Sequence, residues 1–169
     1  MLIISKNHLE FNKDDEVYNV VSDESNELMC PICLSALIKK GRRRRKLIQA
    51  DESTIILSIQ RLKCTVCKKH HHQLPDIIVP YKRHCTETIE NIVSGATEDV
   101  CCFDCTIYKI KAWWILLQQY IKGVAASLSM KYNVNIASIQ KVSEIVRMLA
   151  NTHLWPRYLF GNDVRSEVG

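Results

Sequence analysis

The sequence predicts an α+β fold: a small antiparallel sheet closed by four cysteines, followed by an all-helical region that contains a helix-turn-helix. Three observations support this prediction. Two C-x-x-C pairs flank a segment rich in β-branched residues, the apolar pattern changes to a helical period after Pro80, and turn residues separate the helical stretches. With 169 residues, of which 47% are hydrophobic, the chain suffices for one ordinary domain or two small ones sharing a core.

The chain divides into four expected parts. Residues 1–28 form an acidic segment, 29–80 the four-cysteine ribbon, 81–123 the helix-turn-helix, and 124–169 a helical, apolar C-terminal part. The first part holds one short candidate strand, Val17-Tyr-Asn-Val-Val, and its composition indicates no function.

The expected cellular compartment is inferred from apolar runs, from the start of the sequence and from the cysteines. It has no run of 18 apolar residues and no basic, then apolar, signal sequence at its start. Eight cysteines, several of them in C-x-x-C pairs, indicate metal binding rather than disulfides in a reducing cytoplasm. We therefore expect a cytoplasmic protein without membrane association.

The segment between the two cysteine pairs predicts a β-hairpin. Residues 45–49 and 54–63 supply the two strands, and 49–53 supply the turn. A third short strand is expected from His71 to Leu74.

The first helices are expected soon after Pro80. Residues 86–94 predict a helix with Thr86 as its N-cap and Gly95 at its exit. A second, short helix is expected at 97–102.

A longer helix is expected after Asp104, since apolar residues recur there at spacings of three and four, and Gly123 should end or kink it. The last helix is expected over 136–150, capped by Asn133 or Asn135. The apolar tail from Leu154 to Phe160 should pack on the helices or on a partner.

The two C-x-x-C pairs predict one structural zinc ion. Each pair forms a tight knuckle with both thiolates on one side, and two knuckles complete the tetrahedral four-sulfur shell that zinc prefers. Such a closed shell leaves no position for a catalytic water. The predicted ligands of this zinc ribbon are Cys30, Cys33, Cys64 and Cys67.

Two further groups are weaker metal candidates. The run His70 to His72 could add ligands, although alternation along a strand explains it as well. Cys102 and Cys105 form a third C-x-x-C pair, and Cys101 adjoins it. That pair lacks a partner pair, and helix-packing cysteines are the simpler interpretation.

The basic excess of the chain is concentrated beside the zinc ribbon. Residues 31–85 carry thirteen Lys or Arg against three acids, a balance of +10, whereas the whole chain has +5. A basic run is often a solvated loop, but in this setting it favours salt-sensitive, sequence-indifferent contact with nucleic-acid phosphates. Its cations are Lys39, Lys40, Arg42, Arg43, Arg44, Arg45 and Lys46.

A helix-turn-helix would place the helix after Asp104 in the DNA major groove. If its apolar stripe faces the core, Tyr108, Lys109 and Ala112 point outward, and Thr106 and Lys111 lie on the flanks. The predicted base-reading residues are Thr106, Tyr108, Lys109 and Lys111. A plain helical bundle with an aromatic core stripe is the alternative.

Four segments together resemble a known family. They are Cys30-Pro-Ile-Cys33, Arg61-Leu-Lys-Cys64-Thr-Val-Cys67, Gln73-Leu-Pro-Asp-Ile-Ile-Val-Pro-Tyr81 and Thr106-Ile-Tyr-Lys-Ile-Lys-Ala-Trp-Trp114. They resemble an uncharacterised bacterial family of transposase-like zinc-ribbon proteins, which look like the DNA-binding part of insertion-sequence transposases without the nuclease domain. The resemblance spans roughly residues 28–115 and implies DNA binding and association with mobile elements. The sequence departs from it at Cys101, Cys102 and Cys105.

Three classes of function are compatible with these features. The first is a non-enzymatic, zinc-dependent protein that binds double-stranded DNA, as an accessory or regulator of a mobile element. The second is a compact or remnant transposase, which needs carboxylates arranged around metal ions. The third is an adaptor that docks a recombinase, transposase or polymerase through the apolar tail and the last helix.

Overall fold

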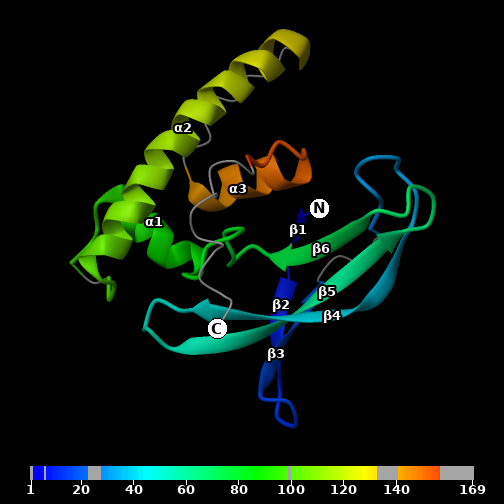
Figure 1. Ribbon diagram of the computed structural model, residues 1–169, viewed down its shortest axis with the longest axis horizontal. Helices are drawn as coiled ribbons and strands as arrows, with labels where there is room; N and C mark the ends of the chain where they lie inside the picture. Colours follow the sequence, from blue (N-terminus) through cyan, green and yellow to red (C-terminus); the bar gives the residue numbers. More distant parts are fainter. Residues whose placement is uncertain (1, 6, 23–27, 99, 133–140, 157–169) are drawn as a thin grey trace, which may run out of the picture.

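Six strands form one mixed, curled sheet, and three helices lie to one side of it (Figure 1). The computed structural model describes residues 2–5, 7–22, 28–98, 100–132 and 141–156. The strands are β1 (Leu2–Ser5), β2 (Asn7–Asn12), β3 (Val17–Ser22), β4 (Leu37–Ile48), β5 (Thr54–Cys64) and β6 (His70–Pro75). The helices are α1 (Thr86–Ser94), α2 (Asp104–Tyr132) and α3 (Val142–Asn151).

β5 is the centre of the sheet and forms a long antiparallel hairpin with β4. β4 pairs with β5 from Leu37, opposite Cys64, to Ile48, opposite Thr54. The other edge of β5 pairs in parallel with β3 and antiparallel with β6. β2 extends the sheet beyond β3, and β1 adds in parallel to β6.

One hydrophobic core joins this sheet to all three helices. Residues directly opposite each other in an antiparallel pair share a face, so Leu47, Ile55 and Leu57 point to the same side. The helices bury their apolar residues against that side. The cluster includes Leu47, Ile55, Leu57, Ile59, Leu74, Ile89, Ile92, Ile110, Trp113, Leu117, Ile145 and Leu149.

The α+β class is confirmed, whereas the expected succession of a small separate ribbon and a helix-turn-helix is wrong. The physical reason is burial. A hairpin of 12 and 11 residues has one apolar face, and a ribbon of about 50 residues has too little of its own core to cover that face. The helices cover it instead.

The strands agree with the sequence prediction in position but not in extent. The candidate strand at 17–21 is β3, the hairpin is present, and the strand at 71–74 lies within β6. β4 starts eight residues earlier than expected, at Leu37 rather than Arg45, and therefore contains the whole basic run. β1 and β2 were not predicted; they make the acidic N-terminal part a component of the sheet.

The helix at 86–94 is confirmed as α1, and Gly95 after it has the left-handed φ of 92°. The N-cap position belongs to Cys85, not Thr86, whose Oγ1 donates to the Asp76 carbonyl at 2.9 Å. The expected helix at 97–102 is wrong: its described residues form local turns. Six residues are too few to offset helix nucleation, and without this helix there is no helix-turn-helix.

The predicted end of the long helix is also wrong, since α2 continues through Gly123 to Tyr132. Figure 1 shows its far end extending away from the sheet. α3 covers the later part of the last predicted helix, whose expected start and caps lie outside the described residues.

The start of the apolar tail packs back on the helices. Trp155 is buried, and the Tyr120 hydroxyl donates to the Leu154 carbonyl at 2.7 Å. The rest of the tail, 157–160, lies outside the described residues. None of the described helices combines the length and hydropathy needed to cross a membrane.

Candidate metal centre and basic strand

The structure brings the four predicted cysteine ligands together at the open end of the β4–β5 hairpin. Cys30 and Cys33 lie in the turn before β4, Cys64 ends β5, and Cys67 lies in the turn before β6. Their four sulfur atoms lie within 4.8 Å of one another. Cys30 and Cys64 are buried, and Cys33 and Cys67 are half-buried.

The sulfur geometry fits a structural metal site. Cys30 Sγ lies 3.6 Å from Cys67 Sγ, and Cys33 Sγ lies 3.4 Å from Cys64 Sγ. A tetrahedral zinc with sulfur ligands at about 2.3 Å requires neighbouring sulfurs to be about 3.8 Å apart. The residues present are therefore those of a single closed four-thiolate site, and a metal there supplies folding energy rather than a reactive position.

Each cysteine pair is followed by a residue in the left-handed conformation. Leu34 follows Cys33 with φ of 55°, and Lys68 follows Cys67 with φ of 59°. The backbone amides of Val66 and Cys67 point at Cys64 Sγ, both at 3.4 Å. The two turns thus share one backbone form, and in the second the amides are oriented to stabilise a thiolate.

Hydrogen bonding and burial shift the pKa values of Cys33 and Cys67 in opposite directions. Hydrogen bonds with Ser35, first through its side chain and then its backbone, lower the pKa of Cys33 to about 6. A backbone hydrogen bond at Lys69 acts to lower the pKa of Cys67, but burial and the three other cysteines outweigh it and raise that pKa to about 11. Four thiolates this close repel one another, so a dication is what allows all four to ionise.

His71 contacts one of the four cysteines and is not itself one of the cluster's ligands. Its imidazole is fully buried, its Nε2 lies 3.6 Å from Cys30 Sγ, and burial lowers its pKa to about 4. A Cys30 thiolate can only accept, so the Nε2–H of His71 is the donor. Hydrogen bonds of this kind orient a metal ligand and fix its charge.

The other metal candidates are not assembled into a site. His70 is exposed, and Cys101 and Cys105 are exposed as well. Cys102 Sγ has His84 Nδ1 at 3.5 Å. Within the described part of the chain, the four-cysteine group is the only cluster of three or more potential ligands.

Three arginines of the basic run contribute to the fold. Arg42 spans the sheet: its guanidinium donates to the Ser58 side chain at 2.7 Å, to the Ser58 carbonyl at 2.9 Å and to the Val20 carbonyl at 2.9 Å. Arg44 pairs with Asp15 of the β2–β3 turn at 3.2 Å. Arg45 is half-buried and donates to the carbonyls of Val79 and Lys82.

The remaining cations of the run are open to a ligand. Their side chains are exposed and form no hydrogen bond or ion pair with any described residue: Lys39, Lys40, Arg43 and Lys46. Before Ile48, which bridges to His84, the second edge of β4 pairs with no described strand.

The predicted base-reading residues lie on another element. Tyr108, Lys109 and Lys111 are exposed near the start of α2, and Thr106 is half-buried. α2 packs on α1, and Figure 1 shows α3 between α2 and the sheet. The predicted base-reading residues thus belong to a helix, whereas the basic run belongs to a strand of the sheet.

Comparison with known proteins matches the part of the chain that contains this site. No curated protein and no solved structure matches the chain. One family model does, from the first metal-ligand cysteine to the first turns of α2. Residues 30–112 thus form a domain of unknown function (DUF6431).

Proposed function

We propose that this protein is a non-enzymatic, zinc-stabilised protein that binds the backbone of double-stranded DNA along β4. The observation that carries the proposal is the row of exposed cations on this strand that have no partner among the described residues. Lysine and arginine side chains replace the counterions condensed on DNA phosphates, and this exchange drives binding. Such contacts position a protein on DNA without reading its sequence.

The metal centre would hold this strand in place. Leu37, the first residue of β4, pairs with the metal-ligating Cys64 at the end of β5. The basic run begins two residues later, at Lys39. A metal bound here clamps the open end of the hairpin and fixes the direction in which β4 leaves it.

The resemblance to transposase-like proteins supports a place among mobile elements. In that setting the protein would act as an accessory or regulator, with sequence preference supplied by a partner. The described residues of β4 offer phosphate contacts, and this makes backbone binding the first property to test.

A second candidate function, an adaptor for a recombinase or transposase, is favoured by one observation on α2. Ile115 and Leu116 on α2 are 57% and 48% exposed, and Phe103, directly before α2, is 84% exposed. Exposed apolar side chains gathered on one element often mark a protein-binding surface.

The experiment measures the affinity of the full chain for random duplex DNA across a range of salt concentrations. The triple variant Lys39→Ser, Lys40→Ser, Lys46→Ser should bind more weakly to every sequence. Its plot of log affinity against log salt should be shallower by about 0.9 for each phosphate that the variant no longer neutralises. Duplex RNA of equal length serves as a competitor.

A charge-matched triple outside β4 and outside the predicted base-reading residues is the control: Lys13→Ser, Lys122→Ser, Lys141→Ser. All three lysines are exposed. This variant should retain wild-type affinity and salt slope. If this control loses as much affinity as the β4 triple, general positive charge and not β4 explains binding. If the wild-type chain does not bind DNA at low salt, the adaptor becomes the better proposal.

A further inference from the structure

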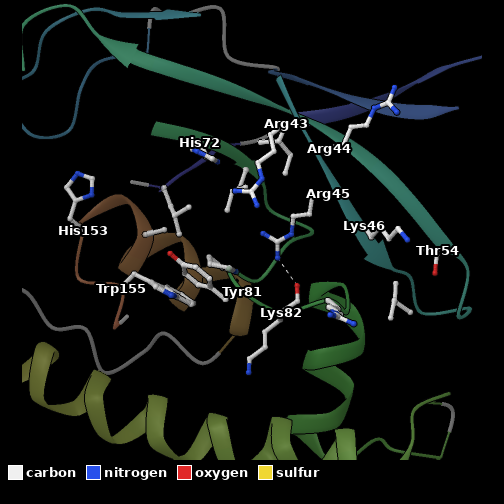
Figure 2. A pocket seen from close by; sticks show the side chains of 17 residues that line it. Arg43, Arg44, Arg45, Lys46, Thr54, His72, Tyr81, Lys82, His153 and Trp155 are labelled. Atoms are coloured by element: carbon white, nitrogen blue, oxygen red, sulfur yellow. Dashed lines mark hydrogen bonds between the residues drawn. The ribbon is translucent and has the colours of Figure 1, made fainter. Parts of the chain in front are cut away.

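A cavity of about 960 Å³ lies between β4 and the end of α3 (Figure 2). Its wall comes from β4, β6, the 80–83 turn and the residues after α3. The volume is at the upper end of the range of about 300–1,000 Å³ that small-molecule sites occupy.

Two arginines point into this cavity from the face of β4 that builds the core. Arg43 lies opposite Ile59 and Arg45 opposite Leu57, so both share the face of the buried Leu47. Figure 2 shows both guanidinium groups directed from β4 toward the cavity, with Arg45 bonded to the Lys82 carbonyl. Charged groups on a core face are costly unless an opposite charge compensates them.

No such charge is present in the described lining. The cavity is lined by four arginines, two lysines and two histidines, and its described lining includes no carboxylate. Burial, and secondly the charge of Arg43, lower the pKa of Arg45 to about 10, which still leaves it protonated at neutral pH. Arg44 pairs with Asp15, whereas Arg43 and Arg45 have no carboxylate partner among the described residues, so an anion would compensate the charge of these two.

The opposite wall is aromatic and conformationally strained. Tyr81 is 50% exposed and has a φ of 64°, and Trp155 lies on the same wall. His153, with φ of 61°, also lines the cavity, and its buried Nε2 has no hydrogen-bond partner among the described residues. Two of the left-handed non-glycine residues thus border this one cavity, and strain of this kind concentrates at binding sites.

We infer that this cavity binds a nucleotide, with its phosphate at Arg43 and Arg45 and its base against the ring of Tyr81. Arginine holds phosphate through paired, charge-assisted hydrogen bonds. A tyrosine ring offers every base a stacking surface. The nucleotide can come from two sources, a free mononucleotide or the end of a single strand. The site can be tested separately from duplex binding along β4, because Lys39 and Lys40 do not line the cavity.

The test is calorimetric titration of the full chain with dAMP, deoxyadenosine and inorganic phosphate at low salt. Both halves of the ligand contribute, so dAMP should bind more tightly than either fragment. Arg43→Gln should weaken dAMP binding about tenfold or more, the effect of losing a charged hydrogen bond. Lys122→Gln, which removes one exposed charge from α2, should change nothing.

Two variants at Tyr81 separate stacking from charge. Tyr81→Gly accepts the positive φ but removes the ring, so it should weaken dAMP and leave phosphate binding unaltered. Tyr81→Phe keeps the ring and should bind dAMP as the wild type does. Arg43→Gln is the deciding charge variant, because Arg45 also bonds to the 79–82 turn and its replacement alters the fold there.

The outcomes are distinct. Absence of dAMP binding at millimolar concentration, or equal binding by the wild type and Arg43→Gln, overturns the site. Competition by a 5′-phosphorylated single-stranded oligonucleotide identifies a strand end as the source, and lack of competition identifies the free nucleotide. Lys39→Ser with Lys40→Ser should reduce duplex binding but spare dAMP, so failure of one proposal can be told from failure of the other.

Discussion

The side-chain amide of Asn151 satisfies both backbone polar groups of Ile4, which lies 147 residues earlier in the chain. Its Nδ2 donates to the Ile4 carbonyl at 2.9 Å, and its Oδ1 accepts from the Ile4 amide at 2.8 Å. The opposite edge of β1 pairs with β6, where Ile4 lies beside Leu74. Asn151, the last residue of α3, thus makes the hydrogen bonds that a further strand would make at this edge of β1.

Asn151→Leu should lower the free energy of unfolding by about 1–2 kcal/mol, because two backbone groups of the buried Ile4 lose their partner. Asn151→Asp keeps an acceptor for the Ile4 amide but loses the donor. Its free energy of unfolding should therefore fall between those of the wild type and Asn151→Leu. Urea unfolding curves measure the difference. Wild-type stability in Asn151→Leu would show that β1 is held without this pair of hydrogen bonds.

Arg42 and Lys40 should separate structural from DNA-binding cations within the basic run. Arg42→Met removes three hydrogen bonds to β5 and β3 and should cost about 1–2 kcal/mol of stability, a value reduced by its exposure to solvent. Lys40→Met should leave the melting temperature unchanged and weaken binding to duplex DNA. Equal stability of the two variants, measured by thermal melting, would contradict this assignment.

Leu34→Gly should stabilise the first cysteine turn. Leu34 is 69% exposed, so little apolar burial is removed, and its φ of 55° imposes a strain that glycine does not have. We expect a gain of up to about 1 kcal/mol in chemical denaturation. Leu34→Ala keeps the Cβ and should give no gain; a gain of the same size in Leu34→Ala would remove backbone strain as the explanation.

Leu117→Ala tests whether the sheet and the helices unfold as one unit. Leu117 is fully buried on α2 in the core shared with β4 and β5, so its truncation should cost about 2–5 kcal/mol. Because the core is shared, tryptophan fluorescence and release of metal from the thiols should shift together to the same lower midpoint. The exposed Gln118 offers a control in Gln118→Ala. Release of metal at the wild-type midpoint, while fluorescence shifts, would indicate an independent ribbon.

Local signals in the sequence were sufficient for the metal cluster and most of the secondary structure. The C-x-x-C spacing specifies a turn whose two sulfurs face one side, whatever the rest of the fold does. Gly95 ends α1 for an equally local reason, its left-handed φ. These predictions needed no knowledge of which elements meet.

Predictions that depended on distant contacts were less successful. The basic run reads as a loop in isolation, but pairing with β5 makes it a strand, and its alternation then divides the arginines between two faces. Arg43 and Arg45 join the core face, and Arg42 and Arg44 turn to Ser58 and Asp15 on the other. Side chains of a strand alternate between its two faces. Counting back by twos from the buried Leu47 reaches Arg45 and Arg43, and this is the one local signal that places them on the core face. No local pattern points to Tyr81 or His153, which reach the cavity through tertiary packing.

The most direct test of the account is the metal content of the purified full-length chain, measured together with its folding. The wild type and Cys101→Ser, whose cysteine is exposed and outside the cluster, should each hold one zinc ion per chain. Cys64→Ser should lose the metal and the cooperative unfolding transition, since the metal fixes the end of β5 on which the hairpin and its basic strand depend. Full zinc content and an unchanged transition in Cys64→Ser would contradict the four-thiolate centre.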